Sequence, residues 1–132
     1  MVVDASVIAT AVADDGPAGD AFRDRLRQDP DLHVPHLLDP EVISALRRQA
    51  LAGLLEGRRA DQARGDLADL PLMRYAHLPL ADRVWELRQA VTAYDGVYVA
   101  LAELLDCRLL TADGRLARAS GPRCPIELLQ AG

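Results

Sequence analysis

Short apolar, strand-like runs alternate with longer helix-like segments along the whole chain, and this alternation most restricts the possible folds. Five runs have strand character: residues 1–4, 32–34, 73–77, 108–111 and 125–129. Helical patterns fill the intervals: residues 5–12, 18–27, 39–53, 57–69, 80–93, 95–105 and 113–119. The sequence contains no internal repeat or low-complexity tract. This order predicts an α/β fold with a mostly parallel sheet covered by helices.

The length and composition predict one folded unit. The chain has 132 residues, of which 50% are hydrophobic, and single domains most often contain about 100 to 150 residues. We therefore expect a single domain over residues 1–132. The apolar runs are far shorter than the roughly 20 residues that span a bilayer, and the first residues do not have the pattern of a signal peptide. We expect a soluble, cytoplasmic protein with no membrane contact, in which Cys107 and Cys124 are reduced thiols.

Acidic residues occupy comparable places in four distant segments. Asp4 ends the first strand, Asp113 follows the strand at 108–111, and Glu41 and Asp95 lie where helices begin. Functional groups in an open α/β sheet gather outside the carboxyl ends of the strands. We therefore expect these four side chains to meet in one crevice.

Four neighbouring carboxylates need a cation or a proton. Two carboxylates about 5 Å apart repel by about 3 kcal/mol at an effective dielectric constant of about 20, which corresponds to roughly two pKa units. All 15 basic residues are Arg, so no lysine can supply the charge. The all-oxygen ligand set instead favours a hard divalent ion, Mg²⁺ or Mn²⁺. Such an ion can activate water and stabilise charge on a phosphoryl oxygen.

The same residues also allow readings without catalysis. Asp95 is suited to capping its helix, Asp113 to closing a turn before Gly114, and Glu41 to stabilising a helix that Asp39 caps. Asp4 is the hardest to explain in this way, because a β-strand disfavours Asp. A non-catalytic interaction domain, whose acids are only helix caps, therefore stays open as an alternative.

Four local strings, in this order, resemble the PIN-domain ribonucleases and, among them, the VapC-type toxins of bacterial toxin–antitoxin modules. The strings are Asp4-Ala5-Ser6, Pro40-Glu41-Val42, Tyr94-Asp95-Gly96-Val97 and Leu110-Thr111-Ala112-Asp113. The resemblance runs over nearly the whole chain. It implies a PIN-like three-layer fold whose sheet has the strand order 3-2-1-4-5.

The resemblance also implies a function. It implies a Mg²⁺- or Mn²⁺-dependent endoribonuclease site in which Asp4, Glu41, Asp95 and Asp113 are the catalytic and metal-binding acids. A DNA-directed or non-catalytic PIN-like module is the closest rival. Receiver-type phosphoacceptor domains and haloacid-dehalogenase-like phosphatases also gather acids at strand ends, but both rely on a lysine. The expected partners are an RNA substrate, a cognate VapB-type antitoxin and a second copy of the chain in a homodimer.

Several other residues receive roles from the same reasoning. By the resemblance, Ser6 and Thr111 are polar catalytic neighbours that orient the carboxylates or a metal-bound water. Arg48 lies seven residues after Glu41 on one helical face, which makes it a candidate to bind a substrate phosphate. Two aromatic residues, Trp85 and Tyr98, are expected to lie in the core or at a dimer contact. The three histidines show no metal-ligand pattern and are expected to serve the fold or the surface.

Overall fold

The computed structural model describes residues 1–130 and contains one five-stranded sheet in the order β3-β2-β1-β4-β5. The strands are β1 (Val2–Val3), β2 (Leu32–Pro35), β3 (Leu72–Tyr75), β4 (Leu109–Thr111) and β5 (Ile126–Leu128). All four neighbouring pairs are parallel. The predicted α/β class and the strand order 3-2-1-4-5 are therefore confirmed.

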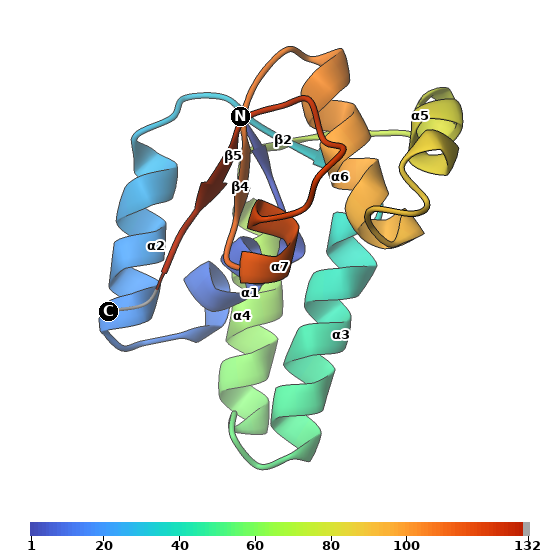
Figure 1. Ribbon diagram of the computed structural model, residues 1–132. Coiled ribbons are helices and arrows are strands. Elements are labelled where there is room, and N and C mark those ends of the chain that lie inside the picture. The colour runs from blue at the N-terminus through green and yellow to red at the C-terminus, as the bar shows by residue number, and fades with distance from the viewer. Residues whose placement is uncertain (131–132) are drawn as a thin grey trace.

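Helices cover both faces of this sheet and give the fold three layers (Figure 1). They are α1 (Ala5–Ala13), α2 (Pro17–Arg27), α3 (Leu38–Leu51), α4 (Gly57–Asp69), α5 (Ala81–Glu86), α6 (Ala93–Leu104) and α7 (Gly114–Ala117), with a 3₁₀ turn at Leu78–Leu80. Right-handed crossovers run from β1 towards β3 and then back to β4, so α1 and α6 lie on opposite faces. Helices α2, α3 and α4 pack around α1, and α5 packs against α6.

The two central strands form the middle of the core. Val2, Val3, Leu109 and Leu110 have no exposed surface, because helices cover both sides of β1 and β4. Strands buried on both faces appear in a sequence as continuous apolar runs, without the alternation of a half-exposed strand. This explains why the short runs around these residues indicate strands so clearly.

Helix α3 begins earlier than predicted, and Asp39, its expected cap, forms an ion pair instead. The helix starts at Leu38, and Asp39 lies inside its first turn. The Asp39 carboxylate pairs with Arg74 of β3, at 2.7 Å and 2.9 Å. The Leu37 N–H just before the helix donates to Nε2 of His77 at 2.9 Å. The predicted Asp39 cap is therefore wrong, and at least one of the histidines serves the fold, as expected.

The continuous helix predicted over residues 80–93 is also wrong. Helix α5 ends at Glu86, and α6 begins again at Ala93. Residues 87–92 separate the two helices, and the last of them, Thr92, caps α6: it is extended, and its hydroxyl accepts a hydrogen bond from the Asp95 N–H at 3.1 Å. The break lets α5 fold back onto α6, where a Cβ on Gly96 would lie only 3.3 Å from Val84.

Three further observations complete the description of the fold. Helix α4 has a narrow apolar face, and it buries only Ala63 and Leu67. Trp85 is 68% exposed, so of its two predicted places, the core and a dimer contact, the core is excluded. Among the described residues, no helix is long and apolar enough to cross a membrane.

Candidate active site

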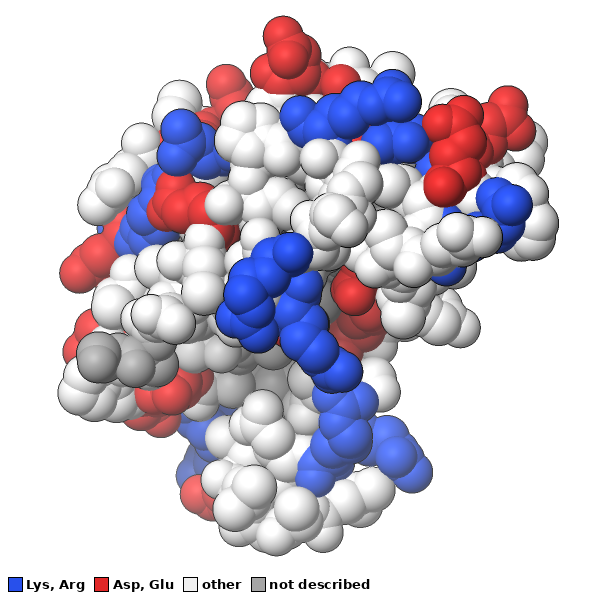
Figure 2. All heavy atoms as spheres, in the orientation of Figure 1, with Lys and Arg blue, Asp and Glu red and all other residues white. Residues whose placement is uncertain are grey.

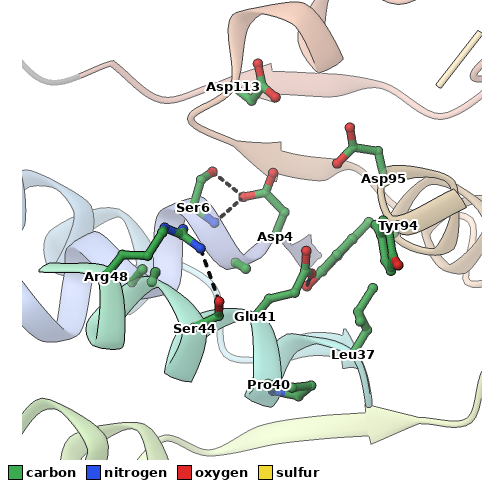
Figure 3. A pocket seen from close by; sticks show the side chains of 14 residues that line it. Asp4, Ser6, Leu37, Pro40, Glu41, Ser44, Arg48, Tyr94, Asp95 and Asp113 are labelled. Atoms are coloured by element: carbon green, nitrogen blue, oxygen red, sulfur yellow. Dashed lines mark hydrogen bonds between the residues drawn. The ribbon is translucent and has the colours of Figure 1, made fainter. Parts of the chain in front are cut away.

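The four acids singled out in the sequence line one pocket of about 480 Å³ (Figure 3). Asp4 follows β1, Glu41 lies in the first turn of α3, Asp95 lies in the first turn of α6, and Asp113 follows β4. Parallel pairing of β1 with β4 brings two of these segments together, and the helices converge at the same edge of the sheet. The structure thus gathers all four residues, as the positions in the sequence predict.

Asp4 is held by hydrogen bonds on both carboxylate oxygens. Oδ1 accepts from the Ser6 N–H at 3.1 Å, the Ser6 hydroxyl at 2.5 Å and the Val7 N–H at 3.4 Å. Oδ2 accepts from the hydroxyl of Thr111. Asp4 is therefore the N-terminal cap of α1. These hydrogen bonds fix its side chain, and the residue is only 6% exposed.

The hydroxyl groups of Ser6 and Thr111 also tie the loop after β4 to Asp4. The Ser6 oxygen accepts from the Ala112 N–H at 3.0 Å, and the Thr111 oxygen accepts from the Asp113 N–H at 3.0 Å. Each hydroxyl accepts from the loop and donates to Asp4, so the carboxylate sets the position of the loop that carries Asp113. Both residues lie beside the acid as predicted, and the structure gives each of them an orienting contact.

Glu41 receives a hydrogen bond that the sequence analysis did not predict. The hydroxyl of Tyr98 donates to Glu41 Oε1 at 2.6 Å, and Tyr98 is only 2% exposed. Tyr98 does belong to the core, but it also fixes a pocket carboxylate. The sequence does contain a feature that predicts this role: Tyr98 follows Asp95 by three residues in the same helix, and residues at this spacing lie on the same helical face.

Two of the four acids are helix caps and two are not. Asp4 caps α1, and Asp113 caps α7 by accepting from the Arg115 N–H at 2.9 Å. Asp95 is not a cap, because Thr92 has that place, and Glu41 lies inside α3. Capping therefore accounts for only half of the set.

The pocket raises the pKa values of three of its carboxyl groups. Burial is the largest cause for Asp4, Glu41 and Asp95. Repulsion among the acids adds to it: Asp95 acts on Asp4 and Glu41, and Asp113 acts on Asp95. Burial and the bond to Glu41 also raise the pKa of Tyr98, which keeps this hydroxyl protonated as a donor. The site thus concentrates negative charge that is incompletely neutralised.

This donor set fits a hydrated divalent cation. Within residues 1–130, no three His, Cys, Asp or Glu side chains are placed to hold a metal ion directly. Mg²⁺ usually keeps several of its waters and binds only one or two protein carboxylates, so separated acids suit it. The pocket offers oxygen ligands without sulfur or imidazole, which favours Mg²⁺ or Mn²⁺ over softer metals.

Arg48 lines the same pocket from α3. Its guanidinium donates to the Ser44 hydroxyl at 3.1 Å (Figure 3). No carboxylate among the described residues forms an ion pair with it. The side chain therefore retains donors that can reach an anion in the pocket.

A family model for the PIN domain matches residues 1–122. The chain belongs to the PIN-domain family. The match includes all four segments that carry the acids and the hydroxyls of Ser6 and Thr111, so the resemblance in the local strings reflects PIN membership. The PIN assignment and the three-layer fold agree with each other.

Curated relatives place this PIN protein in the VapC group. It is 44% identical over 132 residues to VapC ribonuclease Mb0985 of Mycobacterium bovis, which covers 98% of both chains. It is also 44% identical over 133 residues to ribonuclease VapC1 of Mycobacterium tuberculosis, which covers 98% of this chain and 97% of that one. Both matches extend over essentially the whole PIN domain.

A solved structure supports the PIN fold independently of sequence. VapBC2 from Rickettsia felis, bound to a DNA fragment from its promoter, superimposes with a TM-score of 0.69 at 12% identity. The match covers 96% of this chain and 96% of that chain. At this low identity the similarity establishes the PIN architecture alone.

Proposed function

We propose that this protein is a metal-dependent endoribonuclease that acts as the toxin of a type II toxin–antitoxin pair. The convergence of Asp4, Glu41, Asp95 and Asp113 on one pocket carries the proposal. The ribonuclease names of relatives that are 44% identical over nearly the full chain support it. The reaction is hydrolysis: water attacks the phosphorus atom, one P–O ester bond breaks, and the leaving oxygen takes up a proton.

The four acids would hold a hydrated Mg²⁺ or Mn²⁺, partly through the waters that the ion keeps, with Asp4 as the most rigid member of the set. A bound divalent ion would neutralise the carboxylates and stabilise negative charge on a phosphoryl oxygen. Ser6 and Thr111 would keep both Asp4 oxygens in one orientation, because each donates a hydrogen bond to it. A fixed carboxylate costs little reorganisation when the substrate arrives.

Glu41 would move the proton of the attacking water. Tyr98 occupies Glu41 Oε1, so Oε2 is the oxygen on which a proton can be accepted. The raised pKa of the Glu41 carboxyl strengthens it as a base relative to an ordinary glutamate. Asp95 and Asp113 border the opposite part of the pocket and would share the cation.

Arg48 would bind a phosphate of the substrate. The planar guanidinium offers paired donors that match phosphate oxygens, and its place on the pocket wall puts it within reach of a strand lying over the acids. Positive charge is needed at the rim of the pocket because the acids themselves repel RNA.

A VapB-type antitoxin and a second copy of the chain are the proposed protein partners. Large apolar side chains lie exposed at the surface and offer contact area for them: Leu51, Leu54, Leu78, Trp85 and Leu104. An antitoxin segment that lies in the acidic pocket would block substrate entry. We propose a homodimer as the active assembly.

The decisive experiment compares the wild-type chain with Asp4→Asn and Asp95→Asn. We expect Mg²⁺- or Mn²⁺-dependent cleavage of structured RNA, inhibition by a chelator, and loss of cleavage in both variants with the fold retained. Asp61→Asn on α4, an exposed acid away from the pocket, is the matched control. Mapping of RNA 5′ ends in cells expressing wild type or Asp4→Asn would identify the target.

Three outcomes would contradict the proposal. Full activity of Asp4→Asn would exclude the assigned site. Preferential cleavage of DNA would favour the DNA-directed alternative. Absence of a Mn²⁺ binding isotherm, together with a melting temperature that ignores the metal, would favour an interaction domain whose acids only cap helices.

A further inference from the structure

The acidic pocket continues into a second hollow that the proposed function does not use. This hollow has a volume of about 400 Å³ and shares Asp95 and Asp113 with the first. Beyond these acids its wall carries Arg88, from the turn after α5, and Arg115, from α7. We call Arg88 and Arg115 the arginine arm.

The arginine arm carries free positive charge. Both side chains are exposed, and neither forms an ion pair with a carboxylate among residues 1–130. Many other arginines are already paired, for example Arg25 with Glu127 and Arg74 with Asp39. Free guanidinium groups beside the acids are therefore available to a ligand that brings its own negative charge.

Arg88 is held in place before any ligand binds. Its guanidinium lies 4.6 Å from the centre of the Trp85 ring, and Nη1 donates to the Trp85 carbonyl at 2.9 Å. A cation–π contact of this kind, together with the hydrogen bond, restricts the side chain and leaves its other N–H donors free. Arg115 lies near enough to Asp95 to lower the pKa of that carboxyl, in opposition to the effect of burial.

Basic groups thus flank the acids on two sides. Arg48 lies in the first pocket on α3, whereas the arginine arm lies in the second hollow beyond Asp95 and Asp113. Figure 2 shows basic side chains over α7 and over α3, with acidic side chains visible in the hollow beside them. A polyanion laid from one side to the other would cross the acids.

We propose that the arginine arm binds backbone phosphates of single-stranded RNA next to the scissile bond, on the side away from Arg48. This inference rests on the proposed function. The acids repel every phosphate that approaches them, so a strand needs cations both before and after the reacting bond. A flexible single strand can follow the two adjoining hollows, and arginine forks match its phosphates.

Binding of a short fluorescent single-stranded RNA, measured by anisotropy in EDTA, tests the arm without turnover. We expect the double variant Arg88→Ala/Arg115→Ala to raise Kd about tenfold at low salt, and to reduce the slope of log K against log salt by about 1.4, or about 0.7 for each lost phosphate contact. Arg115→Lys keeps the charge and should keep most of the affinity. In the presence of metal the double variant should raise KM more than it lowers kcat.

Arg58→Ala/Arg64→Ala is the matched control. Both residues are exposed on α4, away from the two hollows, and the double change removes the same charge. If the two double variants weaken RNA binding equally, general charge explains the effect and the proposal is wrong. It is also wrong if loss of the arm weakens only antitoxin binding. RNA that binds through the arm but is never cleaved would refute the nuclease proposal alone.

Discussion

Tyr98 of α6 donates its phenolic hydrogen to Glu41 of α3 across 2.6 Å, and this bond joins residues 57 positions apart in the sequence. It fixes one Glu41 oxygen and leaves the other facing the pocket. A core side chain thus determines where a candidate catalytic base can accept a proton.

Tyr98→Phe tests this relationship. The variant keeps the buried ring and removes one hydrogen bond to a carboxylate, so we expect a loss of about 1 to 2 kcal/mol in the free energy of unfolding. RNA cleavage should fall about tenfold because Glu41 loses its fixed orientation. Urea denaturation and initial rates measure the two effects. Tyr75→Phe removes a hydroxyl bonded to His33; a similar fall in its rate would show that the effect is not specific to the pocket.

Arg48→Ala should weaken substrate binding without unfolding the chain. Its only side-chain hydrogen bond among the described residues goes to Ser44. We expect KM to rise about three- to tenfold, with a shallower dependence on salt because one phosphate contact is lost. Arg47→Ala is the control, since Arg47 is an exposed neighbour that does not line the pocket. Equal effects of the two changes would exclude a specific role for Arg48.

Asp4 should make a contribution to the stability of the metal-free protein that is lost as the pH rises. The pKa of Asp4 is raised above its ordinary value of 3.8 by burial, so the folded chain binds more protons than the unfolded chain in this range. The corresponding stability is present below the ordinary pKa and is lost as the pH rises through the raised value. Asp4→Asn removes this loss.

Thermal melts of both chains in EDTA, between about pH 4 and pH 7, measure the effect. We expect the variant to gain stability relative to wild type with each step upward in pH. Addition of Mg²⁺ near neutral pH should then stabilise the wild type more than the variant. A difference between the chains that is constant with pH would contradict the raised pKa.

The contribution of Glu127 to stability should depend on pH in the opposite way to that of Asp4. Hydrogen bonds from Arg25 and then Arg108 hold the pKa of Glu127 at about 2, below its ordinary value of 4.5. The stabilisation is present above the ordinary pKa and is lost as the pH falls through the lowered one. Glu127→Gln should therefore cost about 1 to 3 kcal/mol at neutral pH, allowing for partial exposure. The cost should shrink below about pH 4, and urea denaturation at several pH values follows it.

The sequence predicts the fold well where the signal is local. Buried central strands produce apolar runs, and Asp4 interrupts one of them, so β1 and the start of α1 could be located. The parallel order then brings distant acids to one edge. The convergence of Asp4 and Asp113 follows from that order, because β1 pairs with β4.

The errors arise where a tertiary contact competes with a local preference. Asp39 is a residue type that often caps helices and stands at a suitable position in the sequence, but in the structure its carboxylate forms an ion pair with Arg74. Residues 80–93 have a helical pattern, but α5 ends at Glu86, Leu87 packs into the core and Thr92 caps a new helix. The Tyr98 bond and the arginine arm depend on how α6, α3 and α7 meet. Spacing within one segment cannot specify such contacts between segments.

Asp4 belongs both to the proposed catalytic site and to the folded framework, so its substitution should lower protein abundance as well as activity. Its carboxylate caps α1 and, through Thr111, holds the loop that carries Asp113. Most replacements at this position remove the acceptor as well as the charge. In a genetic selection for cells that escape growth inhibition, substitutions at Asp4 other than Asn should therefore form a class with lowered steady-state protein, whereas Arg48 substitutions should leave the protein level unchanged.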